Sequence, residues 1–198
     1  MVRNGRQAVA LARAGRTITQ GTATPGLAAE LHALEARGLA LLGEANAARR
    51  AALAAQRLYE SVRPGDEPLC QGLYTERVLT ADLGLCLRGI GETKQALTLS
   101  ATALQSCEPW HVRGRSLVQT NVALTHLHGR DLEQAAALGR DAVRTAADVS
   151  STMIVQRLRT LQRQVQPLCS GSPHLRDLDE RITAFLTRSA RQDGDPTA

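Results

Sequence analysis

The sequence has very few aromatic residues and only one lysine, Lys94. Its 198 residues include 1 Phe, 1 Trp and 2 Tyr, against 31 Ala and 29 Leu. Strands favour aromatic and β-branched side chains, whereas Ala and Leu are strong helix formers. The composition therefore predicts an all-α protein, and the length is enough for one sizeable hydrophobic core.

Long apolar runs and paired cysteines are missing as well. No stretch approaches the roughly 18 apolar residues of a membrane-spanning helix, and Arg13 and Arg16 interrupt the short apolar run near the N-terminus. The sequence contains no CxxC pair, because its cysteines are widely spaced at positions 70, 86, 107 and 169. We therefore expect a soluble, cytoplasmic protein with reduced thiols and no membrane contact.

No residue pattern of a known enzyme or metal site is found. Cys107, His111, His126 and His128 do not have a common zinc spacing. Asp177, Asp179 and Glu180 lie on one expected helix between Arg176 and Arg181, which is more typical of an exposed charged face than of a catalytic carboxylate pair. We therefore expect no catalytic residue, no cofactor and no metal ion, and a function other than catalysis.

Capping and turn residues divide most of the chain into segments of helical length. Thr24 followed by Pro25 predicts the start of a first long helix, which should end at Gly43. Further helices are expected over residues 47–62, 73–90, 93–107, 117–127, 132–149, 151–165 and 172–185. We expect a partial N-terminal helix over residues 1–22 and a disordered tail over residues 191–198.

Small residues recur with the same spacing in three successive helix pairs. One small residue in the first helix is followed after 12 and then 7 residues by two more in the second helix. The three triplets are Ala36, Ala48 and Ala55, then Gly84, Ala96 and Ala103, then Ala123, Ala135 and Ala142. The second pair resembles the tetratricopeptide repeat, whose period is about 34 residues. The longer offsets here, 48 and 39 residues, predict insertions, much of the first over residues 63–71.

The repeats predict an all-α, tetratricopeptide-like helix-turn-helix solenoid over residues 23–190. It would contain about three helix pairs and a C-terminal cap from residue 151, because the last repeat of such a stack needs a polar outer face. Ile154, Leu158, Leu161 and Val165 supply the apolar stripe of that cap.

The order of segments over residues 27–187 is similar to a more specific family. The segments LEARGLALLGEANAARRAALAAQRLYESVRPGDEP, YTERVLTADLGLCLRGIGETKQAL and RSLVQTNVALTHLHGRDLEQAAALGRDAV are followed by VQRLRTLQRQV and LRDLDERITAFL. They resemble the C-terminal repeat half of actinobacterial helix-turn-helix transcriptional regulators. The resemblance implies a regulatory module with a protein or peptide partner, and it allows a homodimer. Only about twenty-five residues precede the first clear repeat, too few for a helix-turn-helix domain. We therefore expect either a fragment, or a gene product that has lost its DNA-binding half, or a free-standing adaptor that acts on another protein.

In tetratricopeptide folds the first helices of the pairs line an inner face that binds extended peptides. Carrying these positions over to this chain gives Glu30, Arg37, Asp82, Arg88, Thr120 and Asn121, together with Ala33, Val78 and Leu124. The resemblance implies that Arg37, Arg88 and Asn121 make polar contacts to a peptide carboxylate or backbone. The alternative is that all of these are ordinary surface or packing residues.

Two aromatic positions complete the candidate residues. The related regulators often carry aromatics in the stretch matching residues 70–74, where this chain has Cys70 and Tyr74, so no binding role is assigned there. We expect Trp110 to cover the end of a helix pair, with an exposed anchor as the alternative.

The net charge of +5 permits an acidic partner. The charge is +5 over residues 1–63, −2 over residues 64–150 and +2 over residues 151–198, so it forms no single basic block. Arg157, Arg159 and Arg163 lie among polar helix positions, with no stacking aromatics between them. We do not expect nucleic acid as a direct partner. Direct DNA binding through an arginine-rich helical face is the alternative function.

Overall fold

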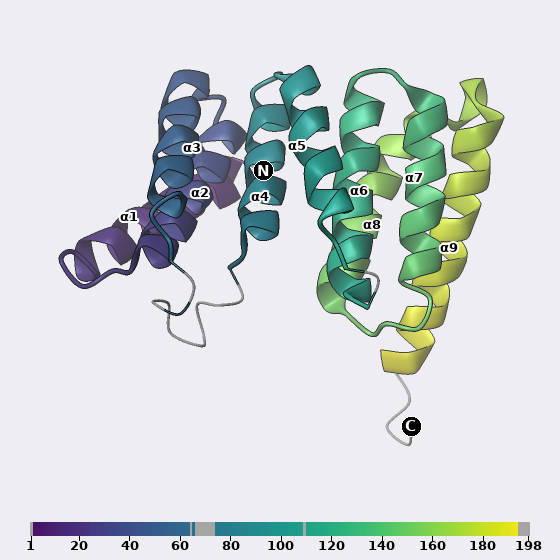
Figure 1. Ribbon diagram of the computed structural model, residues 1–198. Helices are drawn as coiled ribbons and strands as arrows, with labels where there is room; N and C mark the ends of the chain where they lie inside the picture. Colours follow the sequence, from purple (N-terminus) through teal and green to yellow (C-terminus); the bar gives the residue numbers. More distant parts are fainter. Residues whose placement is uncertain (1, 64, 66–73, 109, 194–198) are drawn as a thin grey trace. The chain divides into compact units, whose positions relative to one another are not determined.

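The computed structural model describes residues 2–63, 65, 74–108 and 110–193, and every regular element in these ranges is helical (Figure 1). The all-α prediction is confirmed for this part of the chain. The elements are α1 (Val2–Ile18), α2 (Pro25–Leu41), α3 (Ala45–Tyr59), α4 (Glu76–Gly89), α5 (Thr93–Gln105), α6 (Val112–His128), α7 (Leu132–Thr145), α8 (Thr152–Val165), the short 3₁₀ helix η1 (Gln166–Gly171) and α9 (Pro173–Asp193).

The helix ends follow the capping residues where these are strong. The Thr24 hydroxyl accepts a hydrogen bond from the Leu27 amide at 3.3 Å, so α2 begins at Pro25 as predicted. Gly43 follows α2 with a φ of +79°, a left-handed conformation that glycine adopts without strain. Thr24 and Gly43 therefore mark both ends of α2 in the sequence to within two residues.

Two predicted helix boundaries are wrong by five residues or more, and α7 ends at Thr145, four residues before its predicted end at residue 149. α6 begins at Val112 rather than near residue 117, because Ser116 is part of the packed helix and donates a hydrogen bond to the Ala142 carbonyl at 3.0 Å. α9 continues to Asp193, well beyond the predicted end at residue 185. Residues 191–193 of the predicted tail are therefore helical, and residues 194–198 lie outside the described residues.

The chain divides into two compact units, Met1–Ala103 and Leu104–Ala198. In the first unit, α2 packs against α1, α3 and α4. Its core is made largely of alanine and leucine, with Cys86 fully buried among them. The Gly84 backbone lies close to α5, since a Cβ at this position would stand 2.9 Å from the Ser100 hydroxyl oxygen.

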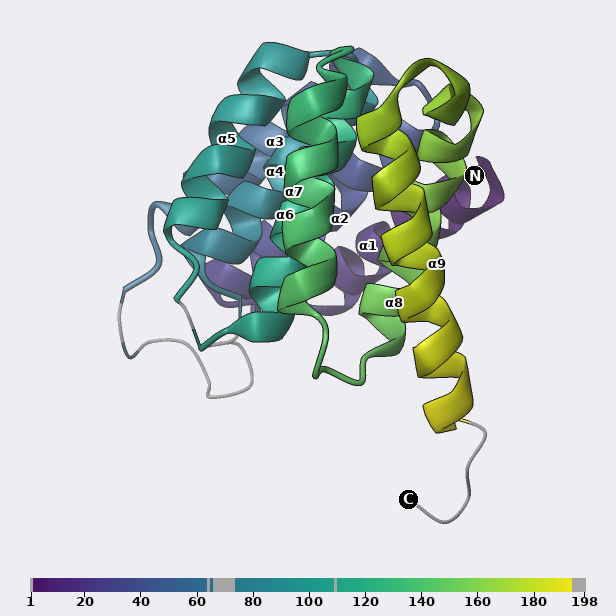
Figure 2. The ribbon, with the colours of Figure 1, turned by 90° about the vertical axis from the view of Figure 1, so that its right-hand side faces the viewer.

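The second unit has a larger leucine and isoleucine core. α7 packs against α6 and α9, and α8 packs against α6 and α9. Figure 2 shows α9 running alongside α7 and α8. Residues that are at most 1% exposed include the predicted stripe of α8, Ile154, Leu158, Leu161 and Val165, together with Leu124, Leu175, Leu178 and Ile182. The stripe is confirmed as buried, and its role as a solenoid cap stays a prediction.

The repeated small residues occupy close-packed positions. The eight alanines of the three triplets are each at most 1% exposed, and Gly84 is buried. Small side chains at these positions let neighbouring helices approach closely. The insertion predicted over residues 63–71 lies almost entirely outside the described residues. The predicted domain limits at residues 22, 23, 190 and 191 stay predictions.

Candidate functional site

Three of the six predicted site residues meet in the first unit. Glu30 and Arg37 lie on α2, and Asp82 lies on α4, which packs against α2. The Arg37 Nη1 atom donates a hydrogen bond to Asp82 Oδ1 at 2.8 Å. The Arg37 side chain is 33% exposed and that of Asp82 is 14% exposed. The ion pair therefore bridges two helices and still faces solvent on the arginine side.

Glu30 shares the electrostatic environment of this pair. Its pKa is raised above 4.5, first because the carboxyl group is partly buried and second because the Asp82 carboxylate is close. We call Glu30, Arg37, Tyr74 and Asp82 the α2–α4 cluster. Its three charged members were predicted from the sequence, and the structure brings them together.

Tyr74 is the member to which the sequence pattern assigned no role. Its pKa is strongly raised, first by burial and then by the charges of Asp82 and Glu30, with Arg37 acting in the opposite direction. Within the described part of the chain its hydroxyl has no hydrogen-bond partner. Its ring meets that of Tyr59 edge-on, with 6.4 Å between centroids and 68° between planes. Tyr59 and Tyr74 are the only two tyrosines in the sequence. Their scarcity could have drawn attention to this place as a candidate site.

The charge balance of the α2–α4 cluster is negative. At neutral pH it contains two carboxylates, one guanidinium and a neutral phenol, a formal charge of −1. The ion pair with Asp82 uses one of the five N–H donors of Arg37. The cluster therefore brings two carboxylates, a guanidinium and a phenol hydroxyl together in one place.

The other predicted site residues lie elsewhere. Arg88 is partly exposed on α4, the helix that also carries Asp82. Thr120 and Asn121 lie on α6 in the second unit and are 1% and 8% exposed. Of the accompanying positions, Ala33 and Leu124 are buried and Val78 is partly exposed.

Thr120 was expected to contact a peptide from an exposed position on α6, but the structure buries it. Its hydroxyl donates to the Ser116 carbonyl at 2.8 Å, one helical turn earlier. Ser116 and Leu124, one turn away on either side, are both buried. Thr120 therefore belongs to the packed face of α6.

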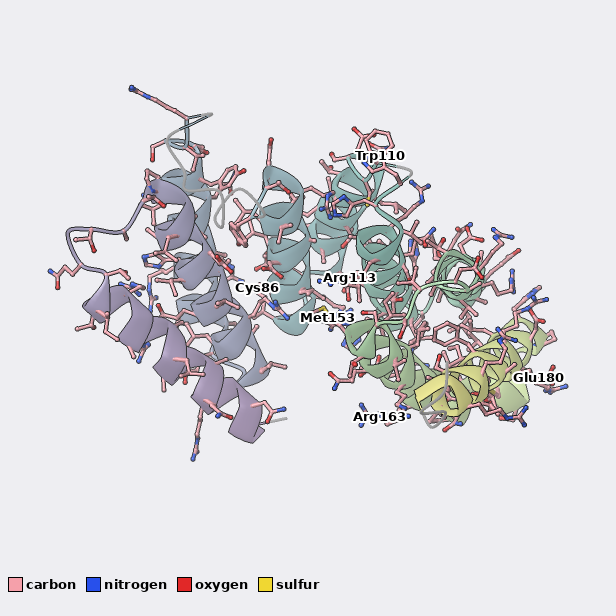
Figure 3. All side chains as sticks on the ribbon, turned by 90° about the horizontal axis from the view of Figure 1, so that it is seen from below. Cys86, Trp110, Arg113, Met153, Arg163 and Glu180 are labelled. Atoms are coloured by element: carbon pink, nitrogen blue, oxygen red, sulfur yellow. The ribbon has the colours of Figure 1, made fainter. Side chains whose placement is uncertain are left out.

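The prediction that Trp110 covers a helix end is wrong. Its side chain is 75% exposed, and Figure 3 shows it pointing outward. The turn before α6 is held instead by Arg115, whose Nη1 atom donates to the Cys107 carbonyl at 3.2 Å. The exposed-anchor alternative is therefore the one that the structure supports.

Two further hollows lie in the first unit. A groove of about 530 Å³ between α3, α4 and α5 is lined by Leu53, Leu87 and Leu99, with Arg49 at its rim. Arg49 Nε donates to Glu92 Oε1 at 2.6 Å. A polar groove of about 740 Å³ lies between α1 and α2, where Arg13 and Arg16 both pair with the buried Glu35.

The structure also bears on metal binding and membrane insertion. Among the described residues no group of three or more His, Cys, Asp and Glu side chains is arranged to hold a metal ion. Three cysteines in these ranges, Cys86, Cys107 and Cys169, are free thiols, and Cys70 lies outside them. None of the helices in the described ranges has both the length and the hydropathy needed to cross a membrane.

Comparison with known proteins found no matching protein family, no matching curated protein and no matching solved structure. The resemblance to tetratricopeptide repeats and to helix-turn-helix regulators therefore rests on the sequence segments and their spacing, and it stays a prediction.

Proposed function

We propose that this protein is a non-enzymatic regulatory module that binds a protein or peptide through the α2–α4 cluster. The observation that carries the proposal is the meeting of Glu30, Arg37 and Asp82, three positions that the repeat pattern assigns to the inner face. An ion pair that is held on two helices and faces solvent on one side is a preorganised polar contact, which reduces the entropy lost when a ligand binds.

The charge of the cluster indicates which peptide groups it would recognise. A formal charge of −1 in a half-buried position favours ligands that present backbone N–H groups or a basic side chain. The partly exposed Arg37 guanidinium can donate to a peptide carbonyl at the same time. We therefore propose an extended peptide with a neutral or basic contact segment as the ligand.

The proposed fold is a tetratricopeptide-like stack of about three helix pairs with a capping pair at the C-terminal end. The buried small residues at matched positions support it, because such stacks need close helix contacts within and between repeats. The resemblance to the repeat half of transcriptional regulators supports a link to transcriptional regulation in the cytoplasm.

A pull-down that compares two ion pairs of the first unit tests the proposed function. The baits are the wild-type chain, Arg37→Gln in the α2–α4 cluster and, as a matched control, Arg49→Gln at the groove between α3, α4 and α5. The lysate is treated with nuclease, and the captured material is washed at raised salt. We expect a protein partner that wild type and Arg49→Gln capture and Arg37→Gln loses. Equal capture by all three baits would contradict the proposal.

Direct DNA binding is the alternative, and the arginines of α8 are the observation in its favour. This helix carries Arg157, Arg159 and Arg163 and no acidic residue. Recovery of nucleic acid alone, lost as the salt concentration rises, would support this alternative over peptide binding.

A further inference from the structure

A groove lined by four arginines lies between α7 and α9 in the second unit. Its volume is about 510 Å³, and it includes Arg140 and Arg144 of α7 and Arg181 and Arg188 of α9. The two arginines on α7 are four residues apart and those on α9 are seven apart, so each pair lies on one face of its helix. Guanidinium groups from two helices therefore converge on one hollow.

Carboxylates of the protein itself pair with three of the arginines that line the groove. Asp177 of α9 lies between Arg140 Nη1, at 3.4 Å, and Arg181 Nε, at 2.9 Å. Asp141 of α7 pairs with Arg144. These contacts show that arginines from both helices can clamp a carboxylate in this place.

The internal carboxylates do not balance the arginines. Four guanidiniums and two carboxylates leave a formal charge of +2 at the groove. Arg188 is exposed and has no hydrogen-bond or ion-pair partner among the described residues, and the Arg144 side chain is 79% exposed. Donors of both residues are therefore accessible to an external anion.

The lining of the groove includes small apolar side chains. Val143, Ala147 and Ala184 belong to its lining, and Val143 is 8% exposed. Small side chains leave room for a peptide backbone beside the arginines. The described lining residues include no aromatic side chain on which a nucleic-acid base could stack.

We propose that the α7–α9 groove binds an acidic peptide segment, with Arg144 and Arg188 contacting its carboxylates. Arg140 and Arg181 are held by Asp177 and set the positive potential of the groove. The proposal is independent of the α2–α4 cluster, which lies in the other unit and has the opposite charge.

Fluorescence anisotropy with a labelled decaglutamate peptide tests the proposal on the full chain. The test variant is Arg144→Gln with Arg188→Gln, and the matched control is Arg159→Gln with Arg163→Gln on α8, which removes the same charge outside the groove. Circular dichroism melts establish that both variants are folded. We expect the test variant to bind about tenfold or more weakly than wild type, and the control to stay within about threefold of wild type.

Three results would overturn the proposal. The first is an absence of decaglutamate binding by wild type at low salt. The second is an equal loss in both double variants, which would show that overall charge rather than the groove attracts the peptide. The third is displacement of decaglutamate from the wild-type groove by a 20-base-pair DNA duplex at equal or lower concentration, which would assign the groove to nucleic acid.

Discussion

Glu30 carries a carboxylate where both burial and the charge of Asp82 oppose its ionisation. The pKa of this group is raised in the folded protein, so above pH 4.5 the folded state binds more protons than the unfolded chain. The free energy of unfolding therefore falls as the pH rises through the interval above 4.5. Such a residue at the centre of a cluster costs stability at neutral pH, which is a common property of binding sites.

Replacing Glu30 by glutamine should therefore stabilise the protein at pH 7. Because the side chain is only partly buried, we expect Tm to rise by about 1–2 °C, and the gain to disappear near pH 4. Circular dichroism melts at the two pH values measure this. The control is Glu180→Gln on the exposed face of α9, which should change Tm little at either pH. A lower Tm for Glu30→Gln at pH 7 would show that the charge stabilises the fold.

Cys86 should be chemically inert in the folded protein. Burial is the main reason why the pKa of its thiol rises to about 11, and the thiolate is the form that reacts with alkylating agents. Mass spectrometry after iodoacetamide treatment at pH 8 should find Cys86 unmodified in native protein and modified in denaturant. The partly exposed Cys169 serves as the internal comparison and should be modified first. Equal rates of modification for the two thiols would contradict the buried position of Cys86.

At the scale of single residues, the sequence predicted the charged part of the α2–α4 cluster and missed its aromatic part. Glu30, Arg37 and Asp82 could be found because the resemblance to tetratricopeptide repeats assigns these positions to the inner face of the first helices. Tyr74 could not be placed, since it precedes α4 and its contact with Tyr59 depends on how the chain returns after α3. Trp110 was assigned wrongly because the Arg115 side chain, which donates to the Cys107 carbonyl, holds the turn before α6.

At the scale of helices, the close approach of α1 and α2 depends on Gly38. A Cβ at this position would stand 2.8 Å from Val9 Cγ2 and 3.0 Å from both the Gly5 carbonyl oxygen and the Val9 amide nitrogen. Two of these three atoms belong to the backbone of α1, which cannot move aside as a side chain does. The helix α1 must therefore shift if position 38 gains a side chain.

We expect Gly38→Ala to destabilise the protein by about 1–3 kcal/mol, although alanine is the better helix former. Urea unfolding measures the difference. The control is Gly171→Ala, since a Cβ there would have no atom within 4 Å and the glycine has an ordinary φ. The control should stay within about 0.5 kcal/mol of wild type. If Gly38→Ala proves as stable as wild type, the described packing of α1 on α2 is incorrect.

Helix boundaries were predictable where a cap or a left-handed glycine marks them. Thr24 and Asp131 are the N-caps of α2 and α7, and their side chains accept hydrogen bonds from amides of the first turn. The start of α6 was missed because Gly114 and its neighbouring arginines resemble a turn in sequence, while the tertiary contact of Ser116 keeps the segment helical. The end of α9 was missed because the helix continues beyond its last buried residue, Phe185.

At the scale of the whole molecule, the charge counted along the sequence conceals two local groups of opposite charge. The α2–α4 cluster of the first unit has a formal charge of −1, whereas the α7–α9 groove of the second has +2. Counting charge along the chain could not show the groove, because its arginines are brought together only when α9 packs on α7. The all-α class, by contrast, follows from composition alone.

The most direct test of peptide binding through the α2–α4 cluster is a charge swap. Exchanging the two partners, Arg37→Asp with Asp82→Arg, keeps an ion pair between α2 and α4 but moves each charge to the other helix. The pull-down is repeated with this variant after nuclease treatment, beside a thermal melt of the variant. We expect the swapped protein to keep a Tm close to that of wild type and to lose the captured partner. Undiminished capture by the folded, swapped protein would contradict peptide binding through the cluster.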